Sequence, residues 1–294
     1  NKNMGDPYIL MLIALAILAM VDLVVGVSND AVNFLNSAIG SKAITIRNIM
    51  IIASIGVFFG AITSSGMMEV AVMITDILLL DVFNTLGMPT STTVSIVFEL
   101  LGAAVAISLI KISQNDAESI SAIWNYINYE KASLIIFGIL LSVVVAFSVG
   151  ALVQFVSRLI YSFNFEKRPS YINALFGGFA ITAITYFIII KGMKGTPYYK
   201  DVKHLIEDNT LLIIAGSFLL WTVISQVFIK VLKLNVLKLI IGIGTFSLAM
   251  AFSGNDLVNF IGVPIAAWNS YEAWSVSGVE ANAFSMEILA KKVP

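Results

Sequence analysis

The stretch VGVSNDAVNFLN, residues 25–36, interrupts a long apolar run with a serine, an aspartate and three asparagines. Far along the chain, FSGNDLVNFIG at residues 252–262 repeats the same pattern. In both copies an Asn-Asp pair is followed, after one residue, by Val-Asn-Phe. Polar side chains in an apolar environment are unfavourable unless they bind something or hydrogen-bond to one another. The two copies therefore need a common explanation.

The composition places most of the chain in lipid. Of the 294 residues, 59% are hydrophobic and 12% are charged, and the mean hydropathy is +0.94. A soluble domain has about 45–50% apolar and about 25% charged residues. The sequence therefore predicts an all-α, polytopic membrane protein whose surroundings are the lipid bilayer. The net charge of −1, without a long basic run, argues against nucleic acid as a partner, and the lack of cysteine excludes disulfides.

Apolar runs of about 20 residues predict membrane spans. The main runs are 8–25, 31–39, 49–64, 70–82, 94–112, 132–155, 171–190, 211–232, 239–252 and 257–268. Two of these runs, 31–39 and 257–268, are short and follow the polar stretches. We therefore expect two broken helices, 8–39 and 239–268, each with an unwound segment after Gly26 or Gly254.

Broken helices at membrane depth are tolerated where they line a cavity. Their free N–H groups suit an anion, so the amides around Asn29 and Asn255 are candidate substrate ligands. Carboxylates and amide oxygens suit a hard cation such as Na⁺, although Asp30 and Asp256 could instead exchange protons. The alternative is that these side chains only hold helices together by hydrogen bonds. Their occurrence in two copies favours a binding site.

A run of hydroxyl side chains lies between the two copies. Gly87 and Pro89 break an apolar stretch, and residues 90–93 are Thr-Ser-Thr-Thr. Hydroxyls at the tip of a re-entrant hairpin, just before a helix, form a neutral group of donors for a phosphate-like anion. An ordinary surface turn is the alternative, and the paired polar stretches favour the binding site.

These motifs resemble those of the inorganic phosphate transporter family of phosphate permeases. That family carries G-x-N-D-x-A-N in each of two inverted halves and P-x-S-T-T-H at a hairpin tip. Residues 26–33 and 254–259 match the first motif, and residues 89–94 match the second. Asp22 matches an acid that often precedes the first signature. Val32 and Val258 stand in place of alanine, and Val94 stands in place of the histidine.

The resemblance implies an inverted-repeat secondary transporter in a plasma or inner membrane, without enzymatic activity. It would carry inorganic phosphate together with Na⁺ or H⁺ and use no other cofactor. The substrate would contact Ser91, Thr92, Thr93, Asn29 and Asn255. The coupling ion would contact Asp30, Asp256, Asn33, Asn259 and Asp22. If sodium couples transport, Asp30 and Asp256 would be the metal ligands.

The expected domains follow from the same resemblance. Residues 1–156 would form the first repeat, with the broken helix 8–39 and a hairpin around 76–112. Residues 157–238 would connect it to the start of a second repeat at 239–294. The family's second hairpin has no counterpart here, so we expect a part of a longer protein. A homo-oligomeric assembly is left open.

Two other functions remain to be weighed. A sulfate permease of the same architecture would differ in its substrate, which accepts hydrogen bonds but does not donate them. An intramembrane aspartyl hydrolase would use Asp30 and Asp256 as a catalytic pair. The hydrolase leaves the hydroxyl-rich hairpin without a role.

Overall fold

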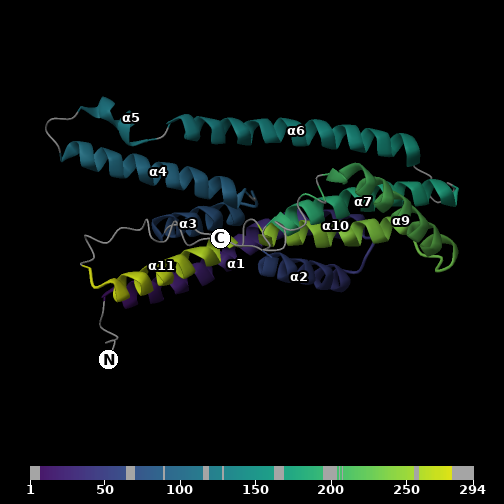
Figure 1. The fold of residues 1–294 in the computed structure, drawn as a ribbon, viewed down its shortest axis with the longest axis horizontal. Helices are drawn as coiled ribbons and strands as arrows, with labels where there is room; N and C mark the ends of the chain where they lie inside the picture. The colour runs from purple at the N-terminus through teal and green to yellow at the C-terminus, as the bar shows by residue number, and fades with distance from the viewer. Residues whose placement is uncertain are drawn as a thin grey trace. The chain divides into compact units, whose positions relative to one another are not determined.

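A computed structural model describes residues 7–63, 70–88, 90–114, 119–127, 129–161, 169–194, 204, 206, 208–254 and 258–279. These residues form helices and turns, without a strand among them (Figure 1). The helices are α1 Pro7–Ser41, α2 Ile46–Thr63, α3 Val70–Thr85, α4 Thr92–Ser113, η1 Ile120–Ala122, α5 Ile123–Tyr126, α6 Tyr129–Tyr161, α7 Ser170–Lys194, α9 Thr210–Lys230, α10 Val236–Phe252 and α11 Val258–Ser277. The predicted all-α class is confirmed.

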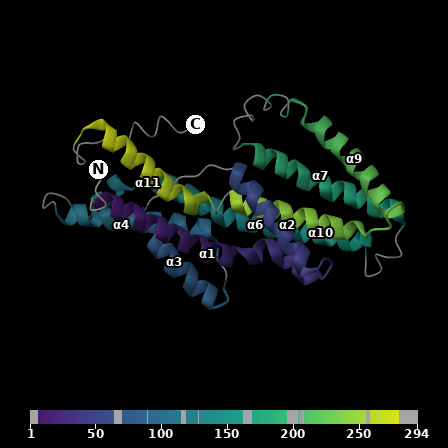
Figure 2. The same ribbon diagram turned by 90° about the horizontal axis from the view of Figure 1, so that it is seen from below.

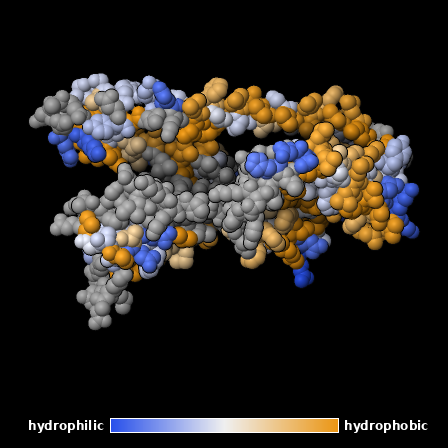
Figure 3. All heavy atoms as spheres, viewed as in Figure 1, coloured by the Kyte–Doolittle hydropathy of each residue, from blue (hydrophilic) through white to orange (hydrophobic). Residues whose placement is uncertain are grey.

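Five helices are long and apolar enough to cross a membrane, judged by length and composition. The segments are Pro7–Ser41, Val94–Ser113, Ala132–Tyr161, Ser170–Ile189 and Thr210–Lys230. Helix α6 exposes apolar side chains along its length, and Phe147 reaches 78% exposure (Figure 3). Such a surface is unfavourable in water and suits hydrocarbon, which agrees with the predicted polytopic membrane protein.

The chain divides into two compact units. The first comprises residues 1–92, 188–199 and 245–294, and the second comprises residues 93–187 and 200–244. Helices α1, α2, α3 and α11 belong to the first unit, together with the end of α10. The predicted division into inverted repeats stays a prediction, because compactness alone does not test an evolutionary repeat.

In the first unit, α1 packs against both α3 and α11. Tyr8 meets Trp274 with ring centroids 4.9 Å apart, and Ala19 packs with Ala267. Residue numbers rise along α1 as they fall along α11, so the two helices are antiparallel. Figure 1 shows α11 beside α1, and Figure 2 shows the same pair from below.

Helix α2 approaches the end of α10 through two glycines in a G-x-x-x-G arrangement. A Cβ atom added at Gly56 would lie 2.5 Å from the carbonyl oxygen of Phe246. One added at Gly60 would overlap the carbonyl oxygen of Met250. Helices in membranes associate through such small residues because their backbones can then come close together.

In the second unit, α7 and α9 pack as an antiparallel pair. Gln226 Nε2 donates to Ser170 Oγ at 3.4 Å, and Gly178 lies against Thr222. The glycine gives the close approach here as well, since an added Cβ would overlap the Thr222 hydroxyl. Small and polar side chains therefore line the contact between these two helices.

The expected break in the first polar stretch is wrong, because α1 is continuous from Pro7 to Ser41. Ser28 does not cap a new helix: its hydroxyl donates to the Val24 carbonyl one turn earlier, at 2.8 Å. Gly26 serves close packing, since a Cβ there would lie 2.6 Å from the Phe260 ring. The polar side chains find hydrogen-bond partners without unwinding the helix.

The second polar stretch follows the end of α10. That helix ends at Phe252, a wider helical turn follows at Ser253 and Gly254, and α11 begins at Val258. Residues 255–257 lie outside the described ranges, so an unwound segment there stays a prediction. Helices α2 and α3 likewise divide the long apolar stretch after residue 49, and residues 64–69 between them are not described.

Candidate anion and cation site

One face of α1 is buried and carries an acid-rich, amide-rich cluster. Its buried residues recur every three or four positions, which is the spacing of a single helix face. They are Leu15, Ala19, Asp22, Gly26, Asn29, Asp30, Phe34 and Ala38. Apolar residues such as Val24 and Val32 are exposed. The polar groups therefore face the inside of the unit, where a membrane protein places groups that function.

The carboxylate of Asp30 lies at the centre of this cluster and is only 3% exposed. Its Oδ1 accepts hydrogen bonds from Nδ2 of Asn29 at 3.2 Å and from Nδ2 of Asn33 at 3.1 Å. Its Oδ2 accepts one from Oγ1 of Thr92 at 2.9 Å. These three donors compensate for the water that the carboxylate loses on burial.

Asn29 connects the same cluster to the turn between α3 and α4. Its Nδ2 donates to the Thr90 carbonyl oxygen at 2.6 Å, and the Thr90 N–H donates to its Oδ1 at 3.2 Å. A primary amide has two N–H hydrogens. Because the second one is directed to Asp30, both hydrogens of Asn29 are engaged within the protein.

The turn presents a short polar tip. Helix α3 ends at Thr85, and Gly87 takes a φ of 69°, a conformation that glycine adopts without strain. Helix α4 begins at Thr92. The tip is held at Thr90 through its backbone and at Thr92 through its hydroxyl, while Ser91 between them is exposed. The first N–H groups of a helix lack intrahelical acceptors, so this tip can receive an anion.

The structure brings four of the predicted site residues into direct contact. They are Asn29, Asp30, Asn33 and Thr92, with Ser91 adjacent at the tip. Asp22, only 1% exposed, shares the buried face of α1 about two turns before Asp30. The remaining predictions fall outside the description: the side chains of Thr93 and Asn259, and all of Asn255 and Asp256.

The described flanks of the two motif copies touch each other reciprocally. Gly26, three residues before the first Asn-Asp pair, contacts the ring of Phe260 in the second copy. Phe252, at the matching position before the second pair, packs on Phe34 of the first copy with ring centroids 5.3 Å apart. Contacts in which each partner uses the same pair of positions are typical of a local two-fold arrangement. They bracket both copies of the motif along the chain.

A family model described as the phosphate transporter family matches residues 26–290. The chain belongs to the phosphate transporter family. This match confirms the resemblance that the motifs suggested. It extends over both Asn-Asp stretches and the hydroxyl-rich tip. Neither a curated protein nor a solved structure matches the chain.

In this member of the phosphate transporter family, sequence reasoning missed two contributors to the cluster. Thr90 takes part through its backbone, which no residue pattern can reveal because every residue has the same N–H and C=O groups. Phe260 packs on Gly26, and here a signal existed. The phenylalanine recurs at the same position in both motif copies, as Phe34 and Phe260.

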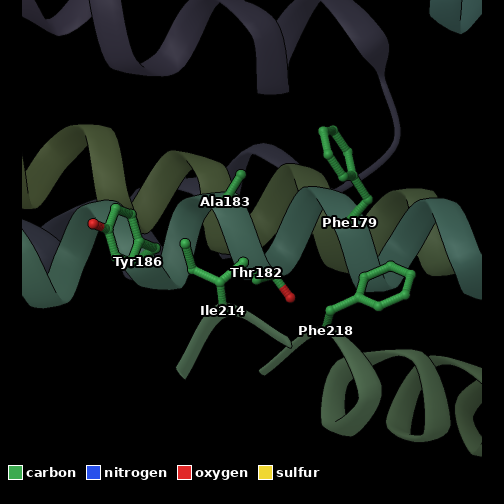
Figure 4. Close-up of a pocket in the computed structure, with 6 residues that line it drawn as sticks. All are labelled: Phe179, Thr182, Ala183, Tyr186, Ile214 and Phe218. Carbon is green, nitrogen blue, oxygen red and sulfur yellow. The ribbon is translucent and has the colours of Figure 1, made fainter. Parts of the chain in front are cut away.

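A cavity of about 460 Å³ lies in the second unit, between α7 and α9 (Figure 4). Its surface is formed almost entirely by carbon atoms. It is lined by Phe179, Thr182, Ala183, Tyr186, Ile214 and Phe218. None of the predicted phosphate or cation ligands is among them. A phosphate ion needs hydrogen-bond donors, so the polar tip of the first unit suits this substrate better than the cavity.

Within the described ranges, His, Asp and Glu form no group of three or more that could hold a metal ion. A transported Na⁺ ion has different requirements, because amide, hydroxyl and carbonyl oxygens can complete its shell. Asp30 supplies a carboxylate, and the amide group of Asn33 and the hydroxyl oxygen of Thr92 hydrogen-bond to it. The predicted Na⁺ role of Asp30 and Asp256 stays a prediction.

Proposed function

We propose that this chain contributes the site of an ion-coupled symporter of inorganic phosphate. Membership of the phosphate transporter family supports phosphate as the substrate. The observation that carries the coupling is the hydrogen bond from Thr92 at the tip to the buried carboxylate of Asp30. It joins a group suited to a cation to a segment suited to an anion.

Phosphate would bind at the tip, through Ser91 and backbone N–H groups at the start of α4. Thr93 and Asn255 would add donors from the neighbouring backbone and from the second motif copy. We assign two residues roles that differ from those expected from the sequence. Because Thr92 and Asn29 direct their hydrogens to Asp30 and Thr90, these two residues would support the tip, while the exposed Ser91 would contact the substrate.

The coupling cation would bind at Asp30 and Asn33, with Asp22 on the same face of α1. Asp256 and Asn259 repeat two of these residues in the second copy, so they are the natural partners across the reciprocal contact. A cation at Asp30 offsets the negative charge of phosphate, and each ligand then raises the affinity for the other. Alternating access would move one part of the transporter against another around this site.

Two chemical alternatives are less well supported. Sulfate differs from phosphate near neutral pH in having no hydrogen to donate, and the matching family is one of phosphate transporters. A hydrolase would require Asp30 to be free to activate water. Instead, three donors from Asn29, Asn33 and Thr92 surround it, and the family is one of transporters.

The natural full-length protein in liposomes provides the test. Uptake of radioactive phosphate is measured with an inward Na⁺ gradient, with an inward proton gradient, and with neither. We expect one of the gradients to drive accumulation, and excess unlabelled sulfate to leave uptake nearly unchanged. Phosphate uptake that is the same with and without each gradient would contradict ion coupling. Strong competition by sulfate would contradict the assignment of phosphate as the specific substrate.

A further inference from the structure

We propose that Asn29 is a coupling clasp, a positioning residue that transmits the state of the cation site to the anion site and does not bind phosphate itself. The proposal rests on the proposed symport. It assigns to Asn29 a role different from the ligand role that its motif suggests. The carboxamide of Asn29 makes three hydrogen bonds, and the proposed role depends on them.

The carboxamide of Asn29 is fully engaged and 0% exposed. Its Nδ2 donates to Thr90 O at 2.6 Å and to Asp30 Oδ1 at 3.2 Å, while its Oδ1 accepts from the Thr90 N–H at 3.2 Å. A phosphate oxygen needs a donor. Asn29 could offer one only by giving up a bond that it already makes in a buried place, which is unfavourable.

The same NH₂ group touches both sites. Nδ2 of Asn29 bonds to the carboxylate of Asp30 and to the backbone of the tip at Thr90. A cation that approaches Oδ1 of Asp30 repels the amide hydrogens that point at this oxygen and competes for its lone pairs. When Asn29 moves in response, its hydrogen bond to the Thr90 carbonyl changes, and this bond holds the tip in place. No contact between cation and phosphate is needed for this transmission.

A second hydrogen bond, from Thr92 to Asp30, also holds the tip against α1. Thr92 donates to Oδ2 of Asp30, and Asn29 hydrogen-bonds to the backbone of Thr90. Both neighbours of Ser91 in the chain are therefore attached to α1. Without Asn29 the tip loses the two hydrogen bonds at Thr90 and keeps the Thr92 connection. Ser91 would still be able to meet phosphate, but its position would no longer depend as strongly on the occupancy of Asp30.

The experiment measures how much the cation increases phosphate affinity. Asn29→Ala in the natural full-length protein is compared with wild type for phosphate binding, once without the driving cation and once with it at saturation. We expect the cation-free affinity to fall by less than about tenfold, because the tip keeps the hydrogen bond from Thr92 to Asp30. The increase caused by the cation should fall by about tenfold, which corresponds to about 1.4 kcal/mol.

Asn36→Ala is the matched control. Asn36 lies about two turns further along α1 and is exposed. This variant removes the same carboxamide from the same helix and should keep the wild-type increase. If Asn29→Ala does not give folded protein, the near-isosteric Asn29→Leu replaces it, because leucine keeps the size of the side chain, adds no charge beside Asp30 and removes both donors and the acceptor.

A thiol-labelling measurement tests the proposed role of Asn29 without measuring transport. The chain has no cysteine, and Met88 beside the tip is exposed, so Met88→Cys provides one thiol in this chain. We expect saturating cation to change the rate of thiol modification in the otherwise wild-type chain. The rate should not respond to the cation when Asn29→Ala is added.

The failure of the clasp and the failure of the symporter are distinguishable. If wild type shows no cation-dependent phosphate affinity, the proposed function fails. If wild type does show it, a loss of cation-free affinity in Asn29→Ala of tenfold or more would make Asn29 a phosphate ligand and overturn the clasp. Coupling unchanged from wild type in Asn29→Ala would overturn it as well.

Discussion

At the scale of single residues, the cluster around Asp30 shows how a carboxylate is accommodated in an apolar helix. Two amides and one hydroxyl donate to it, and each of them comes from a short, well-oriented side chain. Asp30, Asn33 and Thr92 could be singled out from the sequence because buried polar residues in lipid need a purpose. The engagement of Asn29 with the Thr90 backbone could not, since it depends on how the tip folds back onto α1.

Thr92 gives the first prediction. Thr92→Val keeps the shape of the side chain and removes the hydroxyl that donates to Oδ2 of Asp30. We expect the cation-dependent part of phosphate uptake to fall about tenfold. A buried carboxylate that lacks one of its hydrogen-bond donors is destabilised by about 1–3 kcal/mol. Thr92→Ser, which keeps the hydroxyl, should stay within about twofold of wild type. Equal behaviour of the two variants in the liposome assay would argue against the Thr92–Asp30 link.

Gly26 gives the second prediction, which concerns stability. A Cβ at this position would lie 2.6 Å from the ring of Phe260, which is buried and has little room to move. Gly26→Ala should therefore lower stability by about 1–3 kcal/mol, measured as the thermal midpoint in detergent. Adding Phe260→Leu should restore part of the loss. An unchanged midpoint in Gly26→Ala would contradict the reciprocal contact of the two copies.

At the scale of elements, the structure corrects the expectation drawn from glycine and serine. Both residue types predict an unwound segment, yet α1 runs unbroken through Gly26 and Ser28. Ser28 bonds to the carbonyl one turn back, and Gly26 makes room for a neighbouring ring. Sequence alone cannot separate a glycine that breaks a helix from one that permits close packing, because the difference lies in a residue more than 200 positions away. The element order and the turn before α4 were predictable, since they follow apolar length and turn residues.

The contact of α2 with α10 gives a prediction about packing. Gly60→Ala places a methyl group against a backbone carbonyl that cannot rotate away, so we expect a loss of about 1–3 kcal/mol and a lower thermal midpoint. Gly138→Ala in α6 is the matched control. Nothing lies within 4 Å of its added Cβ, and alanine favours a helix over glycine by about 0.5–1 kcal/mol. The two changes should move the midpoint in opposite directions, and a fall of equal size in both would contradict the close approach.

The contact of α7 with α9 is tested by a pair of changes. Gly178→Ala puts a methyl group onto the Thr222 hydroxyl and should lower the thermal midpoint. Thr222→Ala removes the hydroxyl, which is the closest of the atoms in the way, so the double variant should recover an interaction energy of about 0.5–3 kcal/mol. Strict additivity of the two changes would show that these residues do not touch.

At the scale of the whole molecule, the family assignment and the two motif copies support a single function. The copies are far apart in the sequence, but their described flanks touch, and the hydroxyl-rich tip joins the first copy. The sequence predicted the membrane class and the residues of this cluster, because both follow from polar groups that lipid does not tolerate. It could not predict which donors serve the substrate and which serve Asp30, since that distinction depends on individual hydrogen bonds.

The most direct test of the account is the phosphate uptake of Asp30→Asn in liposomes that contain the natural full-length protein. Asparagine keeps the size of the side chain and removes the charge that we assign to the coupling cation. We expect uptake to fall at least about tenfold, and the remaining uptake no longer to respond to the driving Na⁺ or proton gradient. Uptake equal to that of wild type, with the same response to the gradient, would contradict it.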